Sequence, residues 1–297
     1  MRQSFKIILK KHLRHFIRHS SALRALIATL CISAFWAFTH QANADVVWTQ
    51  KEPGLEFGAY SVNNNNSMLL AQVILVRIDP KLFSFTLSST HDNTNSGINK
   101  NSNNRQDIRT LTTNANGIIG INANFFDPNG KALGLLSKNG EKLNPLHQGG
   151  NVLTGIFFIH NDKPRIVHRF DSIPTNNVAL ALQAGPRLIV DGKPTDLTKS
   201  TSTARRSGIA ITQDFKIVIF ASVSPLPGIL LSNIQEMLLK PSIKATDALN
   251  LDGGSSSQIY ISASVSLTGK EIFFGGADTI PVGLIVTRKA TKNIMPQ

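Results

Sequence analysis

The chain has 297 residues, with 31 Lys and Arg against 18 Asp and Glu, and a formal net charge of +13. Seven of the basic residues and none of the acidic ones precede residue 45, so the rest has 24 basic against 18 acidic residues, or +6. That mild excess favours an anionic substrate or surface and excludes the dense basic patch typical of nucleic-acid binding. The only cysteine, Cys31, also precedes residue 45, which excludes an internal disulfide in the remainder.

Residues 1–44 have the order of a secretory signal peptide. A basic region is followed by an apolar run over 25–38 and by Ala42-Asn43-Ala44, a small-x-small cleavage site. The run is about 14 residues long, short of the roughly 20 that span a bilayer. We therefore expect a secreted, periplasmic protein without a stable membrane span after cleavage; an uncleaved N-terminal anchor is the alternative.

The remaining 253 residues suit one domain. We expect a loose entry segment over 45–69, a domain over 70–288 and a tail over 289–297. Asn, Ser and Thr dominate 88–106, which predicts an exposed loop, either a surface insertion or a lid over the substrate. A short helix is expected over 107–116 and another over 233–240, where Ser232 and Gln235 have capping-box spacing. Alternating or apolar runs predict strands over 69–78, 82–87, 117–123, 154–160, 165–169, 178–183, 187–190, 208–212, 216–222, 258–261 and 282–287.

Strands outnumber helices, and no β-α-β alternation appears. The expected fold class is therefore α+β, a single domain with a large, mostly antiparallel or mixed β-sheet and a few helices.

The segment Asn250 to Ser257, N-L-D-G-G-S-S-S, lies between two apolar runs. Gly253 and Gly254 allow a tight turn with outward amides, which can form an anion-binding nest beside Asp252. Ser255 and Ser256 add hydroxyl groups. An ordinary hairpin turn is the alternative interpretation.

The segment Gly120 to Asp127 alternates apolar residues with Asn122 and Asn124, which then lie on one face of a strand. Their amides suit sugar hydroxyls, and Phe125 or Phe126, of which we favour Phe126, can stack on a sugar. Asp127 can order the site or take part in acid-base chemistry. The alternative is that the phenylalanines are core residues and that Asp127 only opens a turn.

Two further segments supply arginines. Arg187 opens a strand after a Gly-Pro turn, and Arg206 follows Arg205 at the entry to another strand. Arginine binds phosphate oxygens bidentately, and neighbouring strand residues face opposite sides, so we expect Arg206 to face the ligand and Arg205 solvent. A surface ion pair for Arg187 and a solvated basic edge for Arg206 are the alternatives. His147 and Asp278 are weaker candidates.

The motifs N-x-N-F-F-D, G-P-R-L, R-R-S-G-I and N-L-D-G-G-S-S, in this order, resemble those of the phosphodiester glycosidase family, which includes the lysosomal uncovering enzyme. The resemblance covers roughly 70–288. It implies hydrolysis of a sugar-1-phosphodiester to free sugar and a phosphomonoester. It also implies that Asn124 and Asp127 lie at the sugar, Arg187 and Arg206 near the phosphate, and Asp252 to Ser256 at the catalytic turn. Ser255 stands where the family often has a third glycine.

The residues fit this chemistry. A phosphomonoester is a good leaving group, so breaking the sugar C1–O bond depends on stabilising negative charge. Asp252 is the expected nucleophile or base, with Asp127 second. Two other functions stay open: a non-catalytic glycan- or cell-wall-binding module, and a metal-dependent phosphodiesterase that cleaves the P–O bond with an ion such as Ca²⁺ held by Asp and Asn oxygens. No other cofactor is expected.

Overall fold

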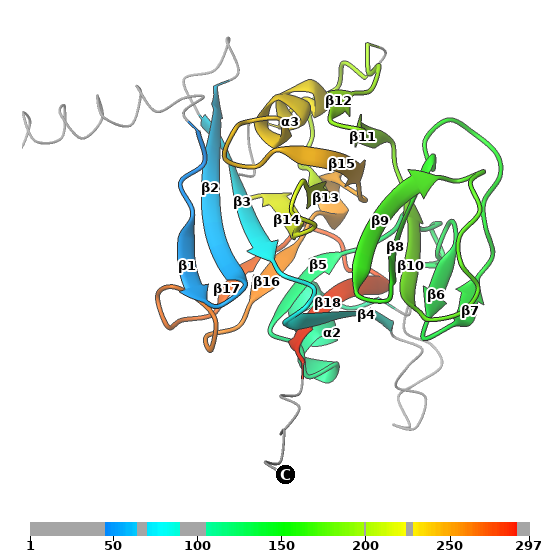
Figure 1. Cartoon of the computed structure of the whole chain (residues 1–297), viewed down its shortest axis with the longest axis horizontal. Coiled ribbons are helices and arrows are strands. Elements are labelled where there is room, and N and C mark those ends of the chain that lie inside the picture. Colours follow the sequence, from blue (N-terminus) through cyan, green and yellow to red (C-terminus); the bar gives the residue numbers. More distant parts are fainter. Residues whose placement is uncertain (1–44, 64–69, 90–104, 199, 224–227, 290–297) are drawn as a thin grey trace, which may run out of the picture. The chain divides into compact units, whose positions relative to one another are not determined.

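The computed structural model describes residues 45–63, 70–89, 105–198, 200–223 and 228–289. The expected signal peptide, most of the loop at 88–106 and nearly all of the tail at 289–297 lie outside these ranges. The described residues form three antiparallel sheets with two short α-helices (Figure 1). The prediction of a mostly antiparallel strand-rich fold is confirmed, but the strands are divided among three sheets instead of forming one large sheet.

The largest sheet has eight strands, and its inner strands, such as β13 and β14, are buried on both faces. Along β14, Ile217 and Ile219 pack into one apolar cluster and Val218 and Phe220 into another. This is why its strands have nearly continuous apolar runs. In spatial order the strands are β1 (Thr49–Glu52), β2 (Leu55–Asn63), β3 (Leu70–Ile78), β14 (Ile217–Ser222), β13 (Ser207–Thr212), β15 (Ala245–Asn250), β11 (Arg187–Val190) and β12 (Lys193–Pro194).

The expectation of a loose entry segment over 45–69 is wrong for its described part. β2 pairs with β3 from Leu55 opposite Ile78 to Asn63 opposite Leu70. Leu55 and Phe57 enter the main core, and Tyr60 and Val62 pack on the opposite face of the sheet. The apolar burial on both faces of the segment gives it a place in the sheet.

A five-stranded sheet forms a second layer. Helix α2 (Ile108–Asn114) packs on it through Ile108 and Leu111, and the side chain of Asp107 caps the helix by accepting a hydrogen bond from Thr110 N at 2.7 Å. The helix expected over 107–116 is thus confirmed. The strands are, in spatial order, β17 (Ile272–Phe274), β16 (Ile259–Ile261), β5 (Ile119–Asn122), β18 (Val282–Arg288) and β4 (Phe83–Ser89).

In the third sheet, the strands expected over 154–160 and 165–169 pair as a hairpin whose turn is formed by Asn161 and Asp162. Both of these residues have positive φ, 49° and 60°, as a tight two-residue hairpin turn requires. The strands are, in spatial order, β7 (Glu141–Asn144), β6 (Leu136–Lys138), β10 (Val178–Ala184), β8 (Gly155–His160) and β9 (Lys163–His168).

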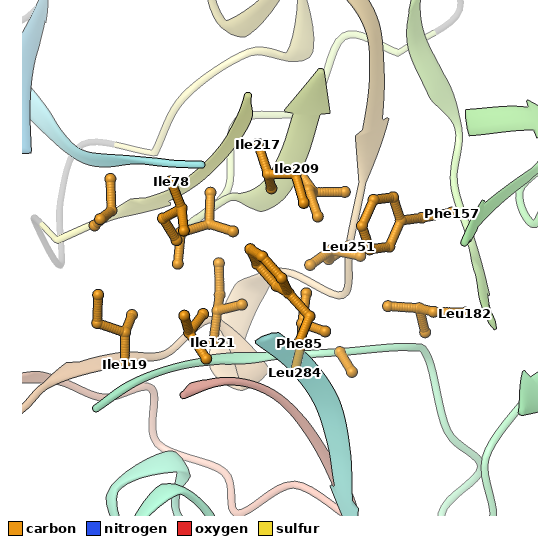
Figure 2. Close-up of a cluster of buried hydrophobic side chains, with 14 of the residues drawn as sticks. Ile78, Phe85, Ile119, Ile121, Phe157, Leu182, Ile209, Ile217, Leu251 and Leu284 are labelled. Carbon is orange, nitrogen blue, oxygen red and sulfur yellow. The ribbon is translucent and has the colours of Figure 1, made fainter. Parts of the chain in front are cut away.

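All three sheets contribute to one apolar core. Figure 2 shows side chains from each of them converging, among them Ile217, Ile121 and Phe157. Leu251, which directly precedes Asp252, is fully buried in the same core. The backbone that carries Asp252 is therefore fixed by the packing of the whole domain.

Helix α3 (Leu231–Leu238) covers the other face of the eight-stranded sheet through Leu231, Ile234, Met237 and Leu238. The predicted helix exists, but the capping box is wrong: the N-cap is Leu230, without a side-chain cap bond. Gln235 instead donates to Leu188 O at 2.8 Å and Thr195 O at 2.9 Å, because its side chain faces β11 and the segment after it.

Candidate functional site

A cavity of about 840 Å³ lies where the ends of β11, β13 and β15 meet the third sheet. Of the predicted site residues, it is lined by Asp252, Arg187, Arg206, Gly253 and Gly254. Three segments that are distant in sequence thus contribute to one site. The rest of its lining is Phe125, Asn151, Val152, Thr154, His168, Gly185, Pro186, Thr195, Asp196, Leu197, Thr198, Ser200, Ser202, Leu231 and Asn250.

Asp252 lies two residues beyond the end of β15 and is tied to the end of β5. Its backbone N donates to Ala123 O at 3.2 Å, and its backbone O accepts from Asn122 Nδ2 at 2.6 Å. Asn122 Oδ1 accepts from Gln258 N at 2.9 Å. Asn122 is only 1% exposed, so its amide holds the turn in place by bonds within the protein.

The Asp252 carboxylate is partly buried, and this burial raises its pKa. Hydrogen bonds from the Ser256 side chain and from Gly253 N, the latter at 2.9 Å, act in the opposite direction, and the nearby charge of Asp278 raises the pKa further. The net shift is upward. Asp252 is thus held at the cavity in an environment that makes its anion more basic than an ordinary aspartate.

The Gly-Gly turn does not form the expected anion nest. Gly253 N donates to the Asp252 carboxylate, and Gly254 N donates to Arg205 O at 2.9 Å. Gly254 has φ of +58°, which explains why glycine suits this position, and it opens a short 3₁₀ helix over Gly254–Ser256. The Ser255 hydroxyl donates to Asp278, outside the cavity lining. Because both glycine amides bond within the protein, neither is available to bind an anion.

Arg187 reaches the cavity beside Gly155 of β8. A β-carbon at position 155 would lie 2.8 Å from Arg187 Cγ, so the side chain passes over a residue that has none. The peptide bond between Gly185 and Pro186, just before it, is cis. Within the described part of the chain, the Arg187 guanidinium makes no hydrogen bond or ion pair, which leaves its donors for a ligand.

Arg206 lines the cavity, as expected. Its Nε donates to Ile229 O at 3.0 Å and its Nη2 to Ser202 O at 2.7 Å, and burial lowers its pKa. Arg205 does not face solvent as expected: it donates to Gly275 O at 2.7 Å and Ser257 O at 3.0 Å, and so holds the far side of the Asp252 turn.

Asp127 does not reach the cavity. Its carboxylate accepts from Asn129 N and Lys131 N, each at 2.9 Å, as in the turn interpretation. Phe126 also lies outside the lining, with the Arg105 guanidinium 4.7 Å from its ring centre, whereas Phe125 lines the cavity. The structure therefore separates Asp127 and Phe126 from Asp252.

Asn124 is 3% exposed, and its Nδ2 donates to Phe125 O at 2.9 Å and Leu133 O at 3.3 Å. It does not line the cavity, and neither does the exposed His147. Like Asn122, Asn124 therefore supports the walls of the site and makes no contact with its open space.

Two wall segments escaped sequence reasoning. The segment 147–153 is held by Gln183, which accepts from His147 N at 2.9 Å and donates to His147 O and Leu153 O at 2.7 and 2.9 Å. Arg169 adds bonds to Gly149 O and Gly150 O, each at 2.6 Å. Residues 195–198, 200 and 202 also line the cavity. The sequence of neither segment shows more than loop composition. The polar Gln183 within an apolar strand was the one feature that could have indicated a bonded loop nearby.

The described residues contain no group of three or more His, Cys, Asp or Glu placed to hold a metal ion. Ca²⁺ binding through other oxygens stays a prediction. Across those residues, no helix has the length and apolar character of a membrane span.

A family model described as phosphodiester glycosidase matches residues 115–287, which is more than half of the chain. The chain belongs to the phosphodiester glycosidase family. The match includes the segments that carry Arg187, Arg206 and Asp252 and confirms the family suggested by the motifs. The family consists of hydrolases acting on glycan phosphodiesters.

Solved structures agree in fold. The catalytic domain of zebrafish N-acetylglucosamine-1-phosphodiester alpha-N-acetylglucosaminidase, auto-inhibited by its pro-peptide, is 14% identical with a TM-score of 0.59, and the match covers 82% of this chain and 88% of that one. A hypothetical protein from Synechocystis is 16% identical with a TM-score of 0.52, over 82% of this chain and 64% of that one. No curated protein matches the sequence. At these identities the structural similarity shows the fold alone.

Proposed function

We propose that the protein hydrolyses a sugar-1-phosphodiester at the sugar C1–O bond, releasing free sugar and a phosphomonoester. The observation that carries this proposal is that Asp252, Arg187 and Arg206 line one cavity, and that neither arginine forms a salt bridge with a carboxylate among the described residues. Asp247 is near enough to attract the Arg187 charge but does not bond to it. Two guanidinium groups with donors left for a ligand favour an anionic substrate.

The charge change of the reaction fits two arginines. A phosphodiester carries one negative charge, and the departing phosphomonoester gains a second, since its second pKa is about 6. Donors placed where this charge develops stabilise the transition state more than the bound substrate. Arg187 and Arg206 supply them, whereas a reaction at an uncharged glycoside would leave both unmatched.

Asp252 serves as the nucleophile or the base, for which its carboxylate must be ionised. Its raised pKa makes the anion a better proton acceptor or nucleophile at neutral pH. Because Asp127 is held in its turn, Asp196 is the other carboxylate of the described lining, and it is exposed. The phosphate leaving group needs little protonation, so one partly buried carboxylate suffices.

The proposal includes the cellular setting predicted from residues 1–44: secretion into the periplasm, where the substrate is a glycan phosphodiester or a lipid-linked sugar phosphate.

The test is incubation of the purified protein with a panel of UDP-sugars and sugar-1-phosphodiesters, followed by assay of free sugar. We expect release by the wild type and a loss of at least about 1000-fold in Asp252→Asn, since a direct participant in the chemistry is removed. Hydrolysis in ¹⁸O-labelled water is expected to place the label in the sugar.

Three outcomes contradict the proposal. Glycan binding without turnover, unchanged in Asp252→Asn, identifies a binding module. Label in the phosphate together with loss of activity in chelator identifies metal-dependent P–O cleavage. Full activity of Asp252→Asn excludes Asp252 from the reaction.

A further inference from the structure

Asn250 bonds to two segments of the cavity lining, the turn before Arg187 and the turn that carries Asp252. It is the last residue of β15, lines the cavity and is 4% exposed. Its backbone N donates to Pro186 O at 3.0 Å, and its Nδ2 donates to Gly185 O at 2.9 Å and Leu251 O at 2.7 Å. One side chain thus bonds both to the turn before Arg187 and to the residue before Asp252.

The orientation of this amide is fixed by its partners. Gly185 O and Leu251 O are carbonyl oxygens that only accept, so the NH₂ group must face both. A hydroxyl group at this position has one hydrogen to donate and can satisfy only one of the two carbonyls. A carboxylate has none and would place negative charge against both.

The position of Arg187 depends on the hydrogen bonds of Asn250, because its guanidinium forms no hydrogen bond or ion pair of its own among the described residues. Its backbone N donates to Thr154 Oγ1 at 3.2 Å, and its stem passes Gly155. The β11–β15 ladder shifts register between Arg187 and Ile189, so the regular pairing is interrupted next to the site. The direction in which Arg187 leaves the backbone is therefore set by the 185–187 turn, and Asn250 fixes that turn to β15.

We propose that Asn250 is a positioning residue that holds Arg187 at a set distance from Asp252, so that the guanidinium meets the phosphate while the carboxylate is at the sugar. The inference rests on the proposed function for its substrate. It assigns to Asn250 an effect on phosphate binding that acts through Arg187.

A double-mutant cycle tests this with inorganic phosphate as the probe, measured by calorimetry. Asn250→Ser should weaken phosphate binding about ten-fold in the wild-type background and less than about two-fold in Arg187→Gln, because an anchor for an absent arginine has no effect. Asn250→Ala, which loses both donors without adding a charge, should behave in the same way. Thermal midpoints identify any variant that fails to fold, and the cycle is completed with whichever Asn250 variant folds.

Asn144 provides a matched control. Its Nδ2 also donates to two backbone carbonyls, Ala132 O at 3.0 Å and Gly134 O at 2.7 Å, but it lies outside the cavity lining. Asn144→Ser should leave phosphate affinity unchanged in both backgrounds. Equal losses from Asn250→Ser in the two backgrounds, or no loss, overturn the positioning role.

The two proposals fail separately. Coupled phosphate binding without sugar release on the panel overturns the proposed reaction and leaves the positioning role. If sugar is released but the losses of phosphate affinity from the Asn250 and Arg187 substitutions are additive, the proposed reaction stands and the positioning role is overturned.

Discussion

Three arginines in or behind the cavity wall bond to backbone carbonyls and not to carboxylates. Arg205, Arg206 and Arg169 together donate to seven carbonyl oxygens, and none of them forms an ion pair in the described residues. A buried charge is usually paired, because desolvation costs several kcal/mol unless hydrogen bonds compensate. Carbonyl dipoles stabilise these cations without cancelling their charge. The Arg206 guanidinium in the lining therefore keeps its positive charge for an anionic ligand.

The raised pKa of Asp252 makes a prediction on pH. As a nucleophile or base Asp252 acts when ionised, so activity should rise as pH increases through its pKa, above the ordinary range of an aspartate. Burial is the main cause, and the Asp278 charge adds to it. Removing that charge in Asp278→Asn stabilises the Asp252 anion, so the rising limb of kcat against pH should move to lower pH.

The measurement is the pH profile of kcat for both proteins on one substrate. Asp171→Asn, an exposed change outside the cavity lining, is the control and should leave the limb in place. A limb that stays put or moves upward in Asp278→Asn would show that Asp278 does not act on the titrating group.

At the scale of elements, the cavity lies where the ends of strands meet loops. One of these loops is held by a single buried side chain, that of Gln183. Gln183 of β10 is fully buried, and it makes two bonds as acceptor, from Leu135 N and His147 N, and two as donor, to His147 O and Leu153 O. Through them the third sheet holds the segment that contributes Asn151 and Val152 to the cavity.

Gln183→Ala should therefore cost roughly 2–4 kcal/mol of unfolding free energy, since it leaves buried backbone groups unpaired. Urea unfolding measures the loss, and hydrogen exchange should become faster at the His147 and Leu135 amides. Gln183→Glu keeps the acceptor but turns a buried carboxylate towards His147 O and Leu153 O, so it should destabilise the protein at least as much as the alanine variant. A loss within about 0.5 kcal/mol for Gln183→Ala would contradict this role.

At the scale of the whole described domain, three sheets share one core, so the domain should unfold as a unit. Phe157 of the third sheet is fully buried in that core together with residues of the other two sheets. Phe157→Ala should cost about 3–5 kcal/mol and lower the midpoint of a single transition.

Phe215, which is 52% exposed in the β13–β14 turn, is the matched control. Phe215→Ala should change the unfolding free energy by at most about 0.5 kcal/mol. Calorimetry and circular dichroism measure both variants. Two separate transitions for Phe157→Ala would show that the third sheet unfolds independently.

Sequence patterns predict the elements whose structure is local. The hairpins at Asn161 and Gln213, the helix capped by Asp107 and the strand-turn-strand at Asp252 follow from turn chemistry and apolar runs. The motifs also predict one site for Arg187, Arg206 and Asp252, and these three residues line the same cavity. Each of these inferences depends on neighbours in sequence or on the family.

Other features depend on partners that no local pattern specifies. The Gly254 amide is taken by Arg205 O, nearly 50 residues earlier in the sequence, so the expected nest does not form. Phe126 was favoured over Phe125 as the stacking residue, but Phe125 lines the cavity and Phe126 packs against the cluster around helix α2. Gln235 matched a capping box and instead bonds to β11 and Thr195.

The bonds that fix the Asp252 turn join residues very far apart in the chain. Asn122 and Asp252 are 130 positions apart, and Asn122 and Gln258 are 136 apart. Contacts of such long range close late in folding, because the entropy of the intervening loop must be lost first. A partly folded chain can hold its hairpins and still lack the site. Catalytic activity would then report that folding is complete, and the nascent chain would be inert towards its substrate until that last closure.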